Sequence, residues 1–132
     1  MLTLPCWIAT HSLPRLSVAT TGGTPRVGNA KQITALGSTG TLSSGGVYGG
    51  PEGLWYLVEI VQAGSESNAR FCYSKDNGIS WSPTDCTPGN LGPCLTASTA
   101  AVALDNGVDV TFTGAVAGSF QTGERWEFSA SY

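Results

Sequence analysis

The side chains that could do chemistry in this chain are four cysteines, one histidine and nine carboxylates. The cysteines are Cys6, Cys72, Cys86 and Cys94. Four thiols can hold zinc, but no pair has the two-residue spacing that structural zinc sites favour, so we predict no metal site. The thiols can stay free or buried, or they can form disulfides in three pairings. A Cys86–Cys94 disulfide would close a loop rich in proline and glycine, and these alternatives stay open.

Neither nucleophilic catalysis nor glycoside cleavage has a suitable set of residues. His11 is the only histidine, and no serine or cysteine lies at a spacing that implies a nucleophile and its base. A glycosidase needs two carboxylates that converge on one cleft, whereas most carboxylates here fall in turns or on wet strand faces. Glu59 has apolar neighbours, so we expect it either to be buried beside Arg70 or Arg125 or to lie at a subunit contact. We predict neither an enzyme nor a cofactor.

Residues 74–81 carry the most specific motif of the chain, Ser-Lys-Asp-Asn-Gly-Ile-Ser-Trp. In a tight turn the Asp76 carboxylate can accept backbone N–H groups, and Gly78 can adopt a dihedral angle that a Cβ atom would forbid. Trp81 would then pack back over the hairpin. The pattern resembles the Asp-box, a hairpin turn of sialidases and of several unrelated β-domains. The residues to which this resemblance gives a structural rather than a catalytic role are Ser74, Asp76, Gly78, Ser80 and Trp81.

Length and composition indicate one domain. At 132 residues the chain is too short for a β-propeller or a whole sialidase. Charged residues make up 11% of the chain, against a usual quarter, which indicates a surface partly covered by neighbours. The net charge is −3 and the six basic residues are scattered, so we expect no direct contact with nucleic acid. We find no signal-peptide pattern and no apolar run of membrane-helix length, and we expect no membrane association.

Strand patterns begin at about residue 46. The segments that show them are 55–61, 71–74, 79–81, 100–104, 108–113 and 126–130. The Asn106-Gly107 pair favours a hairpin turn with positive dihedral angles. We predict an all-β fold over residues 46–132, an antiparallel β-sandwich of Ig-like or jelly-roll-like type with almost no helix. The residues expected in its core are Leu57, Phe71, Trp81, Val110, Phe112, Trp126 and Phe128.

Residues 1–45 show no sustained helical or strand period, and they end in a stretch rich in glycine, serine and threonine. We predict that they form an extended N-terminal arm. Its apolar side chains either add one or two strands to the domain's own sheet or dock on a neighbouring subunit. Under the second interpretation the intersubunit anchors are Trp7, Ile8, Leu13 and Leu16.

An ordered series of glycine-rich and aromatic segments runs from residue 44 to residue 128. The segments are 44–50, 55–60, 63–64, 69–81, 107–113 and 118–128. This series resembles a β-domain of tailed-phage virion proteins, which occurs in tail, sheath, baseplate and other structural subunits. The chain departs from that pattern in the insertion between Cys86 and Cys94 and in carrying the domain almost alone.

The resemblance implies a bacteriophage virion structural protein that acts by assembly, either decorating the capsid or associated with the tail. Its implied partners are copies of itself and other virion proteins, and its implied location is the virion, assembled in the bacterial cytoplasm. The alternative is a carbohydrate-binding module, in which two coplanar aromatic rings exposed in a groove would stack on glycans. Its candidate platforms, most of which fall on strand positions that must fill a core, are Tyr48, Trp55, Tyr56, Trp81 and Trp126.

Overall fold

The computed structural model describes residues 23–132, which form eleven strands and no helix. The strands are β1 (Arg26–Val27), β2 (Lys31–Thr34), β3 (Thr41–Gly46), β4 (Leu54–Gln62), β5 (Arg70–Ser74), β6 (Cys86–Thr87), β7 (Asn90–Leu91), β8 (Leu95–Thr96), β9 (Val102–Ala103), β10 (Val108–Thr113) and β11 (Arg125–Ser131). Every pairing between them is antiparallel. The predicted all-β antiparallel class is therefore confirmed for this part of the chain. Within these residues we find no helix that is long and apolar enough to cross a membrane.

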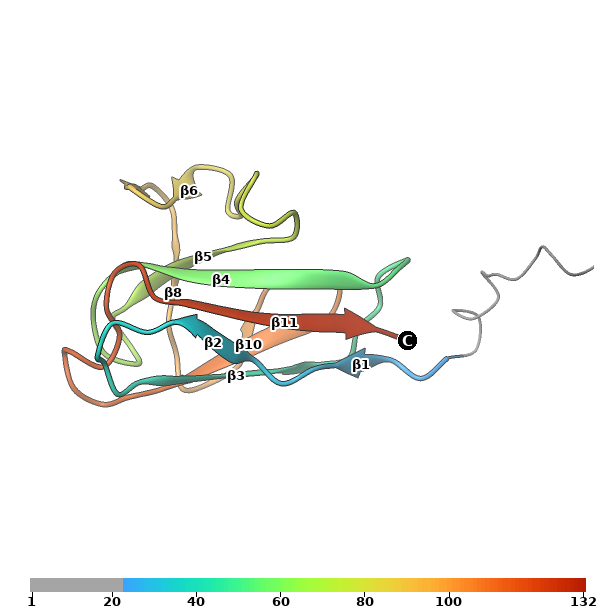
Figure 1. Ribbon diagram of the computed structural model, residues 1–132, viewed down its shortest axis with the longest axis horizontal. Helices are drawn as coiled ribbons and strands as arrows, with labels where there is room; N and C mark the ends of the chain where they lie inside the picture. Colours follow the sequence, from blue (N-terminus) through green and yellow to red (C-terminus); the bar gives the residue numbers. More distant parts are fainter. Residues whose placement is uncertain (1–22) are drawn as a thin grey trace, which may run out of the picture.

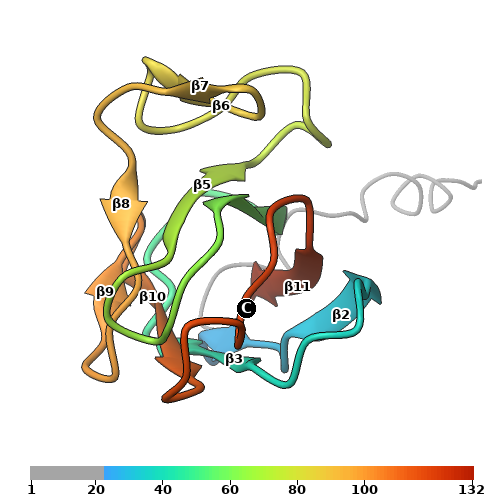
Figure 2. The ribbon, with the colours of Figure 1, turned by 90° about the vertical axis from the view of Figure 1, so that its left-hand side faces the viewer.

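The strands form a larger sheet, a smaller sheet and a short hairpin. In the larger sheet β1 and β2 both pair with one side of β11, and β4, β5 and β8 follow on its other side. The smaller sheet has the order β3-β10-β9, and β6 pairs with β7 alone. The two sheets lie face to face in Figure 1, with the β6 segment outside the larger sheet. Figure 2 shows the chain passing from β8 of the larger sheet to β9 of the smaller one along one side.

Aromatic side chains fill the space between the sheets. The Phe112 ring of β10 lies 4.8 Å from the Phe71 ring of β5 and 5.4 Å from the Phe120 ring, measured between centroids. Phe120 in turn lies 6.0 Å from Trp126 of β11. The predicted core residues found buried are Leu57, Phe71, Val110, Phe112, Trp126 and Phe128. Trp81 is only partly buried, so its placement in the core was wrong.

Strands begin at residue 26, within the segment 1–45 that was predicted to be an arm. β1 and β2 extend the larger sheet, and β3 pairs with the whole of β10. Backbone pairing holds these strands although their side chains are mostly small or polar; Leu42 alone is fully buried in β3. The interpretation in which the arm adds strands to its own sheet is thus confirmed for residues 26–46. The proposed anchors that lie outside the described residues are Trp7, Ile8, Leu13 and Leu16.

The turn between β9 and β10 follows the expected Asn-Gly rule. Asn106 has a φ of +51° and Gly107 a φ of +81°, which are the positive angles that a tight hairpin turn requires. A Cβ atom at Gly107 would lie 2.1 Å from the carbonyl oxygen of Val47. Glycine is therefore needed here both for its dihedral angle and for the close approach of the β3 end.

Candidate functional site

The outer face of the larger sheet carries most of the residues singled out by the sequence, beginning with the Ser74–Trp81 loop. The Ser74 hydroxyl accepts the N–H groups of Gly78 at 2.8 Å and Asp76 at 3.2 Å, and donates to Asp76 Oδ1 at 2.7 Å. Asp76 also accepts the Ser80 backbone N–H at 2.8 Å and the Ser80 hydroxyl at 2.5 Å. Both carboxylate oxygens thus accept hydrogen bonds within the loop, as the turn chemistry of the motif led us to expect.

These hydrogen bonds keep the Asp76 carboxylate ionised. The Ser80 hydroxyl, then the Ser80 backbone N–H and then the Ser74 hydroxyl lower the pKa of Asp76 to about 2. Hydrogen bonds to the charged form favour that form. A general acid works best with a pKa near the operating pH. The geometry therefore gives Asp76 the properties of a loop cap and not those of a proton donor.

Residues 79–81 do not form the second strand of a hairpin, in contrast to the prediction. The Ser80 N–H that would pair with a strand is used by the Asp76 side chain. Further along, Pro83 has no N–H group with which to continue a ladder. A single isolated bridge closes the loop instead. Local side-chain bonding has replaced strand pairing at this point.

Trp81 contacts both the loop and an ion pair on the sheet, in which the Glu59 carboxylate is buried. Its ring lies over Gly78, which has a φ of +87° and whose missing Cβ atom would stand 3.4 Å from the ring. The guanidinium carbon of Arg125 is 5.9 Å from the ring centroid, within range of a cation–π interaction. Arg125 Nε also lies 2.5 Å from Oε1 of the buried Glu59. Of the two partners predicted for the Glu59 carboxylate, Arg125 is therefore the correct one. The Arg70 guanidinium instead donates a hydrogen bond to the carbonyl oxygen of Gly92.

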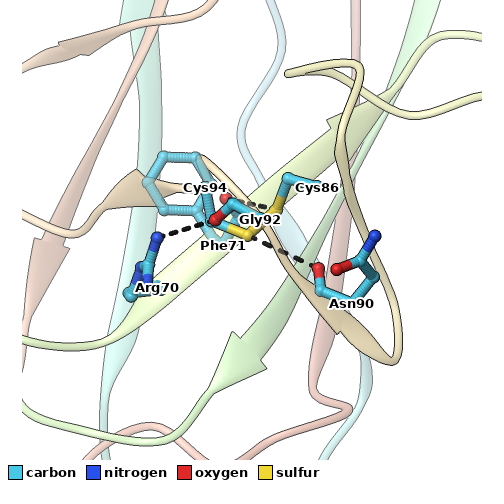
Figure 3. The surroundings of a disulfide bond; sticks show 6 residues. All are labelled: Arg70, Phe71, Cys86, Asn90, Gly92 and Cys94. Atoms are coloured by element: carbon cyan, nitrogen blue, oxygen red, sulfur yellow. Dashed lines mark hydrogen bonds between the residues drawn. A yellow bond between two sulfur atoms is a disulfide. The ribbon is translucent and has the colours of Figure 1, made fainter.

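A disulfide closes a loop in the next segment, and contacts with β5 hold that loop against the same face of the sheet. Cys86 and Cys94 are bonded, and Cys86 Sγ lies 3.8 Å from the carbonyl oxygen of Phe71 in β5 (Figure 3). From β5 the Arg70 guanidinium donates a 2.8 Å hydrogen bond to the carbonyl oxygen of Gly92, between the two cysteines. Of the alternatives left open for the cysteines, the disulfide is thus found for this pair. The segment 75–94, named the cover below, is tied to β5 at several points.

The remaining cysteine of the described residues is buried under the cover. Cys72 is a free thiol that packs with Val61 and Cys86, and the cluster borders Trp81. Burial, and secondarily the nearby Glu59 carboxylate, raise the pKa of Cys72 to about 12, so the reactive thiolate is suppressed at neutral pH. Residues 23–132 contain no group of three or more histidine, cysteine or acidic side chains placed to hold a metal ion.

Two further carboxylates, those of Glu124 and Asp105, hold separate parts of the chain together. Glu124 is fully buried, and it accepts the N–H of Gln121 at 2.8 Å and the N–H of Leu36 at 3.2 Å, together with the Ser38 hydroxyl. It thereby pins the β2–β3 connection to the turn before β11. Asp105 pairs with Lys75 at 2.5 Å, which links the cover to the β9–β10 turn. His11 lies outside the described residues.

Beside the cover, the outer face is open over β4 and β11. A hollow of about 220 Å³ is lined there by Trp55, Tyr56, Leu57, Asn77 and Glu127. Trp55 leaves 63% of its surface exposed. Glu127 stands directly opposite Leu57 in the β4–β11 register, so its side chain lies on the same sheet face. The hollow thus brings together an indole ring, a carboxylate and a side-chain amide.

Among the five aromatic residues considered as sugar platforms, only one is free for stacking. Tyr48, Tyr56 and Trp126 are buried, and Trp81 is half-buried beneath Arg125. Two coplanar exposed rings in one groove are therefore not found among these five. Sequence reasoning missed the remaining polar members of the hollow, Asn77 and Glu127. Strand alternation could have placed Glu127 on the wet face of β11, but no sequence signal sets its register beside β4.

Comparisons with protein-family models, with curated proteins and with solved structures found no match. The described residues offer three features that could serve a function: the cover on the outer face of the larger sheet, the hollow beside it, and the edges of the sheets.

Proposed function

We propose that this chain is a structural subunit of a bacteriophage virion, either an accessory subunit that decorates the capsid or a tail-associated subunit. It acts by assembly and stabilisation, through copies of itself and other virion proteins, and not by catalysis. Its two facing sheets are proposed to form a β-sandwich of Ig-like or jelly-roll-like type, and the Ser74–Trp81 loop is proposed to be an Asp-box. The resemblance of residues 44–128 to virion β-domains is the starting point of this proposal.

The observation that carries the proposal is the open edge of the larger sheet at β2. Among residues 23–132, β2 pairs with β11 and with no other strand, so the outer backbone groups of β2 have no strand partner in that range. Two apolar side chains, Ile33 and Leu36, are 44% and 52% exposed at this edge. Unpaired N–H and C=O groups beside apolar side chains are a template for a strand or loop of a neighbouring chain.

One further feature supports assembly. The low share of charged residues leaves large parts of the surface suited to contact with other subunits. We also propose that the N-terminal segment docks on a neighbouring subunit through Trp7, Ile8, Leu13 and Leu16. Because the bacterial cytoplasm keeps thiols reduced, the Cys86–Cys94 disulfide is proposed to close after the particle leaves its host.

Electron microscopy and native mass measurement of the full chain test the proposal, with particles purified from cells that produce it. We expect the wild-type chain in the particles, and we expect Ile33→Lys at the β2 edge to lower its copy number at least about fivefold, because a charge on an edge opposes strand addition. Val116→Lys is the matched control, since Val116 is exposed and lies outside every strand. A chain that stays monomeric and is absent from purified particles would contradict the proposal.

A second test addresses the N-terminal segment. Deleting residues 1–20 should leave the sheets folded and prevent stable incorporation into particles. If the shortened chain is incorporated at the normal copy number, docking through Trp7, Ile8, Leu13 and Leu16 is wrong, while the edge at β2 can still be judged from Ile33→Lys.

A further inference from the structure

Trp55 is placed unlike any other aromatic side chain of the larger sheet. It lies near the start of β4, the longest strand, where it is paired with Ser129 of β11 and lies beyond the part of β4 that pairs with β5. The next residues on its own face, Leu57 and Glu59, are buried, whereas Trp55 is mostly exposed. A large exposed apolar ring that borders a hollow offers a surface that a ligand or partner can cover.

The hollow at Trp55 has the size of a site for one small ring. Its volume of about 220 Å³ is below the roughly 300 Å³ at which pockets for drug-sized ligands begin. It is open to solvent along the exposed indole of Trp55. A ligand would therefore place one ring against Trp55 and leave the rest of its chain outside.

The chemistry of the lining matches a pyranose sugar. An indole face is flat and apolar and suits the C–H face of a sugar ring. Glu127 supplies a carboxylate that accepts two hydroxyl groups, and Asn77 supplies an amide that both donates and accepts. Among residues 23–132, neither side chain takes part in another hydrogen bond or ion pair that would compete with a ligand.

The charges around the hollow select among ligands. A carboxylate at Glu127 disfavours an acidic sugar, and the chain as a whole carries a net charge of −3. Lys31 stands opposite Glu127 in the β2–β11 register, on the same face. Its positive charge disfavours a cationic ligand, although an indole beside a carboxylate would otherwise suit one. A neutral sugar is repelled neither by the Glu127 carboxylate nor by the Lys31 ammonium group.

The hollow is also held in shape before a ligand arrives. Asn77 has a φ of +59°, and it is fixed between Asp76 and Gly78 by the hydrogen bonds of Ser74 and Asp76. Glu127 and Trp55 project from paired strands. A site built on rigid elements loses little entropy on binding.

We propose that this hollow binds a single pyranose ring of a neutral glycan, with the ring stacked on Trp55 and its hydroxyl groups held by Glu127 and Asn77. The hollow lies on the outer face beside β2, whereas the outer backbone groups of β2 lie along the edge of the sheet. The proposal does not depend on the virion role. On a particle with many copies, weak single sites would add up to tight attachment to a glycan-bearing surface.

Nuclear magnetic resonance of the nitrogen-15-labelled full chain tests this proposal through the indole N–H signal of Trp55. The probes are methyl β-D-glucopyranoside, methyl β-D-galactopyranoside and N-acetyl-D-glucosamine, each up to about 50 mM because one sugar ring contributes few contacts. We expect at least one of them to shift the Trp55 signal with a millimolar Kd. We expect N-acetylneuraminic acid and choline to bind at least about tenfold more weakly.

Variants separate this site from any other. Because Trp55→Ala removes the indole signal itself, the variants are compared through the backbone amide signal of Asn77, which lines the same hollow. Trp55→Ala should abolish the binding and Glu127→Gln should weaken it about tenfold, with Tm nearly unchanged for Trp55→Ala because the ring is exposed. Val116→Ala is the control, with another exposed apolar side chain, and should bind like the wild type. The proposal fails if no neutral sugar shifts the Trp55 signal, if Trp55→Ala still binds, or if choline or the acidic sugar binds as tightly as the best neutral probe.

Discussion

The two faces of the larger sheet are stabilised in different ways. The inner face packs against the smaller sheet through aromatic rings, with Phe71, Phe112 and Trp126 buried in one apolar core. The outer face carries the cover, which is closed by a disulfide within it and is held in place by the Lys75–Asp105 ion pair, the hydrogen bond from Arg70 to Gly92 and the contact of Trp81 with Arg125. Apolar burial beneath the cover is confined to a small cluster.

This difference separates folding from function. The inner face buries most of the apolar surface, and that burial is the main driving force for folding. On the outer face, hydrogen bonds within the Ser74–Trp81 loop fix Asn77 beside the hollow. The cover leaves Trp55 exposed. The residues that can meet a ligand are therefore positioned by polar and covalent contacts on a platform that the core has already built. Variants on the two faces should differ in both size and kind of effect.

The largest effect is expected in the core between the inner face and the smaller sheet, where Phe112 of β10 packs on Phe71 of β5. Phe112→Ala removes a fully buried ring that contacts two others and should lower the free energy of unfolding by about 3–5 kcal/mol. Phe112→Leu, which keeps most of the volume, should cost less than about 1.5 kcal/mol. Urea denaturation followed by tryptophan fluorescence measures both. Equal losses for the two variants would mean that cavity formation does not govern this face.

Reducing the disulfide should have the next largest effect. The bonded cysteines are separated by 8 positions, and closing so short a loop contributes about 2–3 kcal/mol through the entropy of the unfolded chain. Urea denaturation with and without a phosphine reductant measures this difference. A chain carrying both Cys86→Ala and Cys94→Ala should show no response to the reductant. A loss as large as that of Phe112→Ala would show that the cover is part of the core.

Removing the arginine that pairs with the buried Glu59 should cost less again. Arg125→Ala leaves the buried Glu59 without its partner, and we expect a loss of about 1–2 kcal/mol, at the low end for such pairs because the Arg125 side chain is 40% exposed to water. Arg26→Ala in β1, an exposed position, is the control and should change stability by less than about 0.5 kcal/mol. Equal stabilities of the two variants would show that the pair does not fasten the outer face.

The smallest effect, and one that depends on pH, is expected at Asp76. Its pKa is lowered from 3.8 to about 2 in the folded chain, so between these values the unfolded state binds more protons. The stability that Asp76 contributes is thus present above pH 4 and lost as the pH falls toward 2. Asp76→Asn should lower Tm by a few degrees at pH 7 and by less at pH 2. A constant difference in Tm across this range would contradict the assignment.

The strands with a strong apolar pattern could be predicted from the sequence. Residues 108–113 and 126–130 alternate and lie within β10 and β11, because alternation along a strand follows from the pleat itself. Residues 55–61 are apolar on both faces except at Glu59, as suits a central strand, and lie within β4. β1 and β2 are short and mostly polar, and β3 consists mainly of threonine, serine and glycine, so they carry little apolar pattern; their order comes from backbone pairing with β10 and β11.

The candidate site could be predicted only in part. The hydrogen bonds of Asp76 and the positive φ of Gly78 follow from local turn chemistry. The partial burial of Trp81 and the exposure of Trp55 do not, because they depend on which part of the outer face the cover reaches. Strand register, which sets Glu127 beside Leu57, is likewise a property of the assembled sheet.

Hydrogen exchange of the full chain before and after reduction of the disulfide tests most directly whether the cover on the outer face and the core on the inner face are stabilised independently of each other. We expect amides of the cover, residues 75–94, to lose protection on reduction, while those of β4, β10 and β11 keep theirs, because the core between the sheets does not need the cover. Loss of protection in β4, β10 and β11 to the same extent as in the cover would contradict independent stabilisation of the two faces.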